Sequence, residues 1–231
     1  MELLRIENLY KSYGEKKVLQ NINLIIPKGK IIGLLGKNGM GKSTLIKLIN
    51  DLLTPTKGKI LVNGKPIGAE SKSIISYLPE RISLDKSMTV KSAIKYYSDF
   101  YENFDANKAN TLLLDLGLDP NMKLSKMSKG MQEKVQLVLV MSRNAQLYIL
   151  DEPLGGVDPA TRDYILDTIL SNFSEGASVI ISTHLISDIE RILDEVIFLD
   201  NGQIVLADDC DTLRQKENGS IDEIFRRMFK C

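Results

Sequence analysis

The chain has 231 residues, of which 43% are hydrophobic and 26% are charged, as is usual for one folded domain with a sizeable core. Thirty basic residues balance thirty acidic ones, so the composition gives no sign of a basic nucleic-acid-binding surface. The only cysteines, Cys210 and Cys231, lack metal-ligand spacing, which predicts free thiols in a reducing, intracellular compartment. The longest apolar runs fall well short of the roughly 20 residues of a spanning helix, so no transmembrane segment is expected.

The first half of the chain alternates strand and helix patterns. A continuous apolar run at 31–35 predicts a strand buried on both faces, as in a parallel sheet. Glycines follow it, and a helix is expected over 42–53. Asn63-Gly64 is a preferred hairpin turn and predicts paired strands on either side. Further strands are expected at 3–9, 18–26 and 74–79.

The middle of the chain, from about 89 to 143, is poor in glycine and has a helical apolar period. Five aromatic residues form a stripe there. Core packing is the favoured interpretation of the stripe, and a groove that receives a partner helix is the alternative. The stripe consists of Tyr96, Tyr97, Phe100, Tyr101 and Phe104.

The strand and helix alternation then returns. Buried strands are expected at 147–151 and 178–183, with a helix at 160–173 between them. Asn201-Gly202 predicts a second hairpin, and a short amphipathic helix docked on the core should follow at 220–230. This organisation predicts an α/β core with an inserted helical subdomain.

Residues 36–44, GKNGMGKST, fit the phosphate-loop pattern G-x-x-x-x-G-K-[ST], in the strand-before, helix-after context that the pattern requires. Glycines let the backbone approach phosphates, and the loop amides with the helix N-terminus attract an anion. Lys42 should bridge the β- and γ-phosphates, Ser43 should bind Mg²⁺, and Thr44 should assist at the α-phosphate. The expected nucleotide-binding residues are Gly36, Lys37, Asn38, Gly39, Met40, Gly41, Lys42, Ser43 and Thr44.

Two buried strands should carry further polar residues to the same sheet edge. Asp151 ends the first strand and suits a magnesium shell, whereas Glu152 points elsewhere and can polarise an attacking water. His184, the single histidine, follows the second strand and could donate a hydrogen bond to the γ-phosphate. Solvated acids and a structural histidine are the alternatives.

These motifs, in this order, resemble the nucleotide-binding subunit of ABC (ATP-binding cassette) transporters over nearly the whole chain. The Walker A loop at 36–44 is followed by a Q-loop region, YLPER, and by a signature at 127–131, MSKGM. The Walker B segment at 147–152, a D-loop, GGVDP, and the H-loop His184 complete the set. The segments SYLPERISLDKSMTV and SKGMQEKV are similar to those of bacterial ABC-2-type exporters, including ones linked to antibiotic resistance and envelope stress.

The resemblance implies a single P-loop NTPase domain over 1–231, with a RecA-like core and an antiparallel β subdomain. Residues 1–86 and 144–231 would form the core with this β subdomain, and residues 87–143 would form an inserted α-helical subdomain that carries the signature.

The resemblance also implies partners and further site residues. Tyr13 would stack on adenine, and Ser128 and Gly130 would contact the γ-phosphate of ATP held by a second subunit, with Asp158 at the D-loop. Glu152 and His184 would act in catalysis, with ATP and Mg²⁺ as cofactors. A homodimer or heterodimer at the cytoplasmic face of the membrane would drive a separate permease, and no nucleic-acid partner is expected.

Two positions depart from the family pattern. Lys129 and Met131 replace Gly and Gln in the usual signature, Leu-Ser-Gly-Gly-Gln. Glu80 occupies the position of the Q-loop glutamine; its carboxylate can bind Mg²⁺ but adds a negative charge beside ATP.

Three other functions compete with a transport ATPase. A cassette acting on DNA or ribosomes would need a coiled-coil insertion or a second cassette. A nucleotide sensor with little turnover is suggested by Glu80, Lys129 and Met131, but Glu152 and His184 argue against it. A P-loop kinase leaves the signature and the Asp151-Glu152 pair unexplained.

Overall fold

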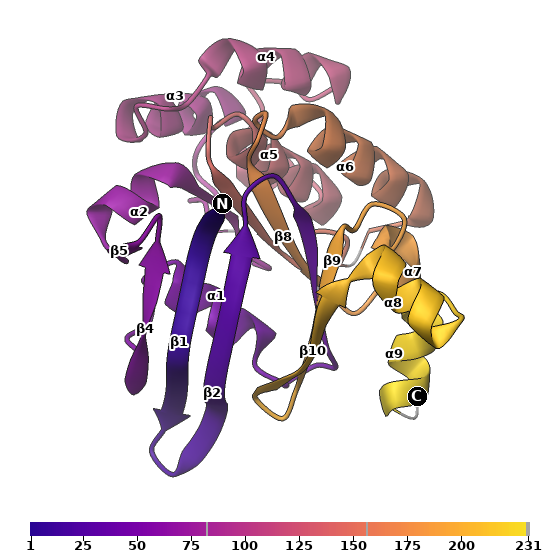
Figure 1. Ribbon diagram of the computed structural model, residues 1–231. Coiled ribbons are helices and arrows are strands. Elements are labelled where there is room, and N and C mark those ends of the chain that lie inside the picture. Colours follow the sequence, from indigo (N-terminus) through magenta and orange to yellow (C-terminus); the bar gives the residue numbers. More distant parts are fainter. Residues whose placement is uncertain (82, 156, 230–231) are drawn as a thin grey trace.

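The structure is a computed structural model that describes residues 1–81, 83–155 and 157–229. A four-stranded antiparallel sheet of order β2-β1-β4-β5 covers one side of the molecule (Figure 1). The turn at Asn63-Gly64 joins its last two strands, which confirms the first predicted hairpin. The strands are β1 (Glu2–Tyr13), β2 (Lys16–Pro27), β4 (Lys57–Val62) and β5 (Lys65–Pro66).

A six-stranded sheet of order β10-β9-β3-β8-β7-β6 forms the centre. Its neighbouring strands run parallel except at the β9–β10 hairpin, so the carboxyl ends of β3, β8, β7 and β6 meet at one edge. β7 and β8 are buried along their whole length, as the sequence predicts. The strands are β3 (Ile31–Leu35), β6 (Ile75–Leu78), β7 (Leu147–Asp151), β8 (Ser178–Thr183), β9 (Glu195–Asp200) and β10 (Gln203–Asp209).

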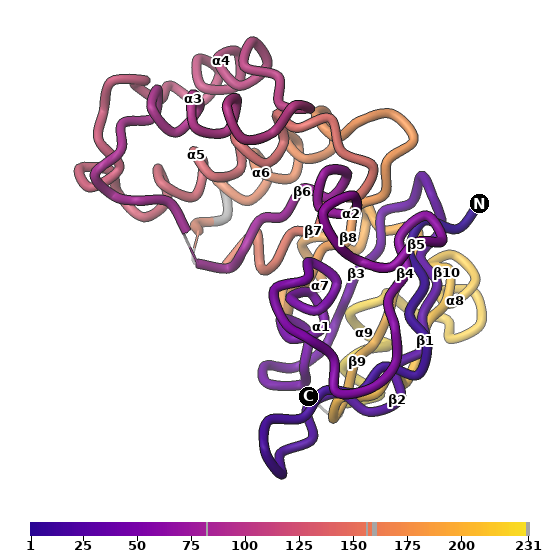
Figure 2. The backbone as a smooth tube through the Cα atoms, turned by 90° about the vertical axis from the view of Figure 1, so that its left-hand side faces the viewer, coloured from indigo at the N-terminus to yellow at the C-terminus, as the bar shows by residue number. Residues whose placement is uncertain are grey.

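Helices α3, α4 and α5 gather at one end of the molecule, away from the antiparallel sheet (Figure 2). They are α3 (Val90–Phe100), α4 (Ala106–Asp115) and α5 (Lys129–Met141), with a 3-10 turn, η1 (Leu124–Lys126), before α5. The other helices are α1 (Lys42–Ile49), α2 (Ala69–Ile74), α6 (Pro159–Asn172), α7 (Ile186–Ile189), α8 (Cys210–Glu217) and α9 (Ile221–Phe229). None of the helices in the described ranges combines the length and the apolar character that a membrane crossing requires.

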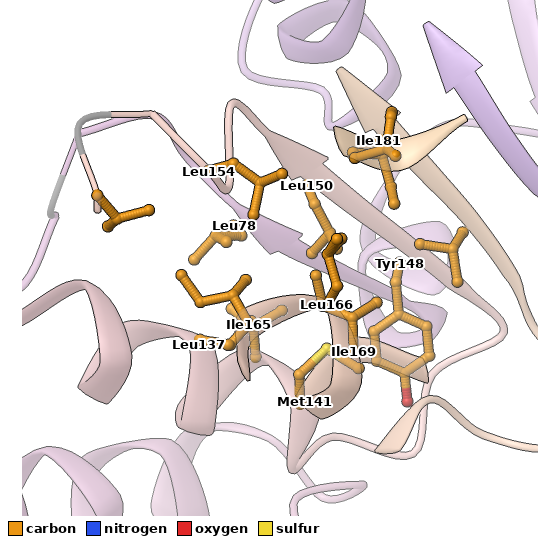
Figure 3. Packing of buried hydrophobic residues seen from close by; sticks show 14 of the residues in the cluster. Leu78, Leu137, Met141, Tyr148, Leu150, Leu154, Ile165, Leu166, Ile169 and Ile181 are labelled. Carbon is orange, nitrogen blue, oxygen red and sulfur yellow. The ribbon is translucent and has the colours of Figure 1, made fainter. Parts of the chain in front are cut away.

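The central sheet divides the core into two clusters, because successive side chains of a strand point to opposite faces. Tyr148 and Leu150 of β7 pack with α5 and α6 on one face (Figure 3). Leu147 and Ile149 pack with α1 and the antiparallel sheet on the other. Helix α5 therefore shares a core with the strand that ends in the Asp-Glu pair. The division at residues 87 and 143 stays a prediction.

Two expectations need correction. Helix α1 ends at Ile49 rather than at residue 53, because Asn50 caps it and Asp51 adopts a left-handed backbone with φ of 54°. The aromatic stripe is only partly core. Tyr97 and Phe104 pack against the buried cluster, whereas Tyr96 and Phe100 are 50% and 65% exposed and stack with ring centroids 6.0 Å apart.

Candidate functional site

The phosphate loop joins β3 to α1, and packing within the chain requires two of its glycines. A Cβ on Gly36 would lie 2.4 Å from the carbonyl oxygen of Leu199. A Cβ on Gly41, whose φ is 108°, would lie 2.8 Å from the Leu19 side chain. These glycines therefore let the loop pack against Leu199 and Leu19, and they also give phosphates access to the loop backbone.

Lys42 folds back over the loop. Its Nζ donates to the carbonyl oxygens of Gly36 at 2.6 Å and Lys37 at 3.3 Å. Burial lowers the pKa of Lys42, whereas the carboxylates of Glu152 and Asp151 act in the opposite direction. The fold thus holds a desolvated ammonium group at the place where phosphate charge is expected.

Hydroxyl groups from two neighbouring elements donate hydrogen bonds to Asp151. Its Oδ1 accepts from Ser182 of β8 at 2.5 Å and from Ser43 of α1 at 3.3 Å. A carboxylate beside a phosphate-loop serine is a fitting donor set for Mg²⁺, which binds one or two carboxylates, waters and substrate phosphates. The structure therefore brings together Ser43 and Asp151, two of the residues predicted to bind Mg²⁺.

Glu152 has a strained backbone, with φ of 52° immediately before Pro153. Residues before proline favour extended conformations, and such outliers persist only where the surroundings enforce them. Here the Glu152 amide donates to the carbonyl oxygen of Ser182 at 2.9 Å. The side chain lies between two others: its Oε1 is 3.8 Å from Lys42 Nζ, and its Oε2 is 3.0 Å from His184 Nδ1. The backbone therefore aims this carboxylate at the phosphate loop and at the histidine.

A cleft of about 1330 Å³ opens beside these groups. Six basic side chains and three acidic ones face it, a balance that suits a polyanionic ligand. The bases are Lys16, Lys17, Lys42, Arg81, Lys86 and Lys129, and the acids are Glu80, Glu133 and Glu152. Most predicted site residues line the same cleft: Tyr13, Asn38, Gly39, Met40, Gly41, Lys42, Ser43, Thr44, Glu80, Glu152 and His184.

Six predicted residues are not part of the lining that the described residues form: Gly36, Lys37, Asp151, Ser128, Gly130 and Asp158. Gly36 and Lys37 begin the phosphate loop and Asp151 accepts from Ser43, so only the last three lie away from these groups. Ser128 caps α5, where its Oγ accepts from the Met131 amide at 3.2 Å. Asp158 caps α6 and accepts from the Thr161 amide at 3.1 Å. Within this chain, the two side chains stabilise helix N-termini.

Tyr13 and Glu80 both line the cleft. Tyr13 is 49% exposed, and Lys11 Nζ lies 4.9 Å from its ring centroid. Glu80 is exposed just beyond β6. Adenine stacking by Tyr13 and metal binding by Glu80 stay proposals, as do the roles of the other site residues.

Sequence reasoning missed the second function of the Asn201-Gly202 turn. The turn packs on the phosphate loop, where the Gly202 amide donates to the Met40 carbonyl at 3.2 Å and the Asn201 amide lies 3.3 Å from Met40 Sδ. A Cβ on Gly202 would lie 2.2 Å from the carbonyl oxygen of Val18. The Asn-Gly dipeptide gave a signal for the hairpin, but its packing partner depends on tertiary structure.

Comparisons with known proteins agree on one family. The ABC transporter family profile matches residues 19–155. The lantibiotic transport ATP-binding protein SrtF of Streptococcus pyogenes is 31% identical over 210 residues, which cover 90% of this chain and 92% of that protein. A solved ATP-binding subunit of an ABC transporter is 29% identical with a TM-score of 0.89, covering 98% of this chain and 99% of its own. A dimeric cassette in a post-hydrolysis state, bound to ADP and phosphate, shares the fold at 22% identity and a TM-score of 0.79. The match covers 90% of this chain and 98% of that cassette.

Proposed function

This chain belongs to the ABC transporter family as an ATP-binding, ATP-hydrolysing subunit, and we propose that two such subunits enclose two MgATP and drive a separate membrane permease. The observation that carries the proposal is a division of the predicted site residues. Residues 38–44 of the phosphate loop, Glu152 and His184 line one cleft, whereas Ser128 and Gly130 do not, although Lys129 between them does. A second subunit would bring its own α5 N-terminus to the open side of that cleft.

In the proposed reaction, the loop amides and Lys42 hold the phosphates of ATP. Glu152 polarises the attacking water, because its carboxylate is held between Lys42 and His184. His184 orients that carboxylate and donates to the γ-phosphate. Ser43, Asp151 and Glu80 would hold Mg²⁺, which neutralises phosphate charge when it is bound.

Dimerisation is proposed from the form of the α5 N-terminus. Ser128 presents a hydroxyl at a helix N-terminus, which is a good anion clamp and a poor catalyst. A Cβ on Gly130 would meet no described atom within 4 Å, so contacts within this chain do not require glycine there. Close approach of a second subunit's nucleotide would require it. The dimeric cassette of the same fold supports this arrangement.

The permease is proposed to contact the exposed aromatic pair, Tyr96 and Phe100. Large apolar side chains at 50% and 65% exposure are typical of binding surfaces, and both lie on α3. The lantibiotic transport relative supports a transport role, and the resemblance to ABC-2-type ATPases supports export at the cytoplasmic face of the membrane.

Three measurements on the purified chain test this function. We expect Mg²⁺-dependent release of phosphate from ATP, an ATP-dependent dimer by light scattering, and co-purification with a membrane protein encoded beside it. Stimulation of hydrolysis by DNA or ribosomes, with no membrane partner, would contradict the transport role. Absence of turnover both alone and with the membrane protein would favour the nucleotide sensor.

A further inference from the structure

A small second cavity lies between α5 and the ends of β6 and β7, next to the main cleft, with which it shares Glu80, Glu133 and Glu152. Its volume is about 20 Å³. We call it the α5 cavity. Leu78, Leu137 and Ile165 form its apolar wall (Figure 3). Its polar lining is acidic apart from one amide, and consists of Glu80, Glu133, Gln136, Asp151 and Glu152.

Two polar atoms of α5 lining this cavity are buried without a hydrogen-bond partner among the described residues. They are the amide nitrogen Nε2 of Gln136 and the carboxylate oxygen Oε2 of Glu133. Gln136 is 2% exposed, so solvent does not replace the missing acceptor. Buried polar groups without partners are rare in native proteins, because each carries a desolvation cost. An unpaired donor and an unpaired acceptor on two residues that line one small polar space indicate that a polar group fills it.

The size and chemistry of the space match one water molecule. A site needs about 10–15 Å³ of this kind of volume and two to four polar partners to hold a water. Such a water would accept a hydrogen bond from Gln136 and donate one to Glu133. Its second proton would point toward the Asp151-Glu152 end of β7, which lines the same cavity. The other oxygen of Glu133, Oε1, pairs with Lys129 Nζ at 3.4 Å and leaves Oε2 as the unpaired atom.

We propose that an ordered water in the α5 cavity, held by Gln136 and Glu133, positions the catalytic Asp151-Glu152 segment against helix α5. The proposal rests on the function proposed above, which places Ser128 of this helix against the partner's nucleotide. Glu133 and Gln136 follow Ser128 by five and eight residues, a rise of roughly 7.5 and 12 Å along one helix. The water thus connects the helix that meets one nucleotide with the glutamate that hydrolyses the other. Gln136 and Glu133 are positioning residues in this scheme.

Gln136→Leu is the sharpest test, because Gln136 lines the α5 cavity and is not among the described residues that line the main cleft. Leucine removes the amide that holds the water and also the buried polar group. We expect unfolding temperature to be unchanged or raised, KM for ATP to be unchanged, and kcat to fall about fivefold, the effect of one lost hydrogen bond. A purely structural glutamine would instead lower stability and leave kcat unchanged.

Val138→Ala is the matched control, because Val138 is a fully buried α5 residue that does not line the cavity. We expect it to lower stability without the selective loss of kcat. Gln136→Asn, which keeps an amide, should lose less kcat than Gln136→Leu. Wild-type kcat in Gln136→Leu, or a kcat loss in Val138→Ala as large as in Gln136→Leu, would overturn the proposal.

A crystal structure at high resolution gives a direct second test. We expect a water within hydrogen-bond distance of Gln136 Nε2 and Glu133 Oε2 in the wild type, and its loss in Gln136→Leu. An empty cavity, or direct pairing of the two side chains, would overturn the proposal. If the shared-site dimer were wrong, Ser128→Ala would not lower hydrolysis at the facing site, while the water and the Gln136→Leu result persisted. If the water proposal alone were wrong, the Ser128→Ala effect would remain.

Discussion

The end of β7 and the start of α5 are the two regions that should meet nucleotide, and the fold prepares them differently. Asp151 and Glu152 contact side chains from several other parts of the chain, including Ser182, Lys42 and His184. Ser128, by contrast, accepts from an amide of its own helix and lies outside the cleft. Contacts within one chain organise the first region, whereas the proposed dimer assigns the second region a ligand held by the partner.

The largest effect is expected at the end of β7. Glu152→Gln keeps the shape of the side chain but removes its basicity, so ATP binding should persist while kcat falls by at least about 100-fold, the usual scale for loss of a general base. The variant should accumulate as an ATP-bound dimer. Single-turnover hydrolysis and light scattering check the two parts. Full hydrolysis in this variant would contradict the role of Glu152.

A change in the phosphate loop should have the next largest effect, and this effect should be a loss of MgATP affinity. Lys42→Ala removes a buried ammonium group that faces the phosphate site, at a loss of about 1.5–3 kcal/mol for a hydrogen bond to a charged group, or roughly 10- to 150-fold in MgATP affinity. Isothermal titration measures this change. Lys47→Ala, on the same helix, is the control and should bind normally. Unchanged affinity in Lys42→Ala would count against the phosphate-loop assignment.

Ser128→Ala tests the contrast between the end of β7 and the start of α5 directly. Its effect on hydrolysis should appear at only one of the two nucleotide sites. In a mixed dimer of wild-type and variant subunits, the site facing the altered α5 should lose about tenfold in hydrolysis, the scale of one hydrogen bond to a charged group. The helix also loses its N-cap, which costs about 1 kcal/mol in stability. Thr89→Ala removes the corresponding cap of α3 and controls for that loss. Equal damage at both sites would refute the shared geometry.

The same contrast separates what the sequence could predict from what it could not. The phosphate loop and Asp151 were predictable because strand, turn and helix signals are local and the carboxyl ends of parallel strands share one edge. The left-handed backbone of Glu152 was not predictable, since a residue before proline favours an extended conformation. The exposure of Phe100 was also hidden, because a helical period marks an apolar face without saying what covers it.

Tertiary contacts account for the other differences. The Asn201-Gly202 hairpin was visible in the sequence, but its packing on Met40 joins residues about 160 positions apart. Gln136 has the pattern of an ordinary helical residue in the sequence, and its burial beside Asp151 and Glu152 depends on tertiary structure.

Gly130→Ala should produce the smallest effect on the isolated chain, in the stabilising direction. Alanine fits the open space there and is a better helix former, so the free energy of unfolding should rise by about 0.5 kcal/mol. The ATP-dependent dimer should nevertheless weaken, because the new methyl group lies where the partner's phosphate would approach. Gly41→Ala should do the opposite: its Cβ collides with Leu19, so the monomer itself should be destabilised. Thermal unfolding and sedimentation of both variants test the pair. Normal ATP-dependent dimerisation of the Gly130→Ala chain would mean that the start of α5 does not meet the partner's nucleotide.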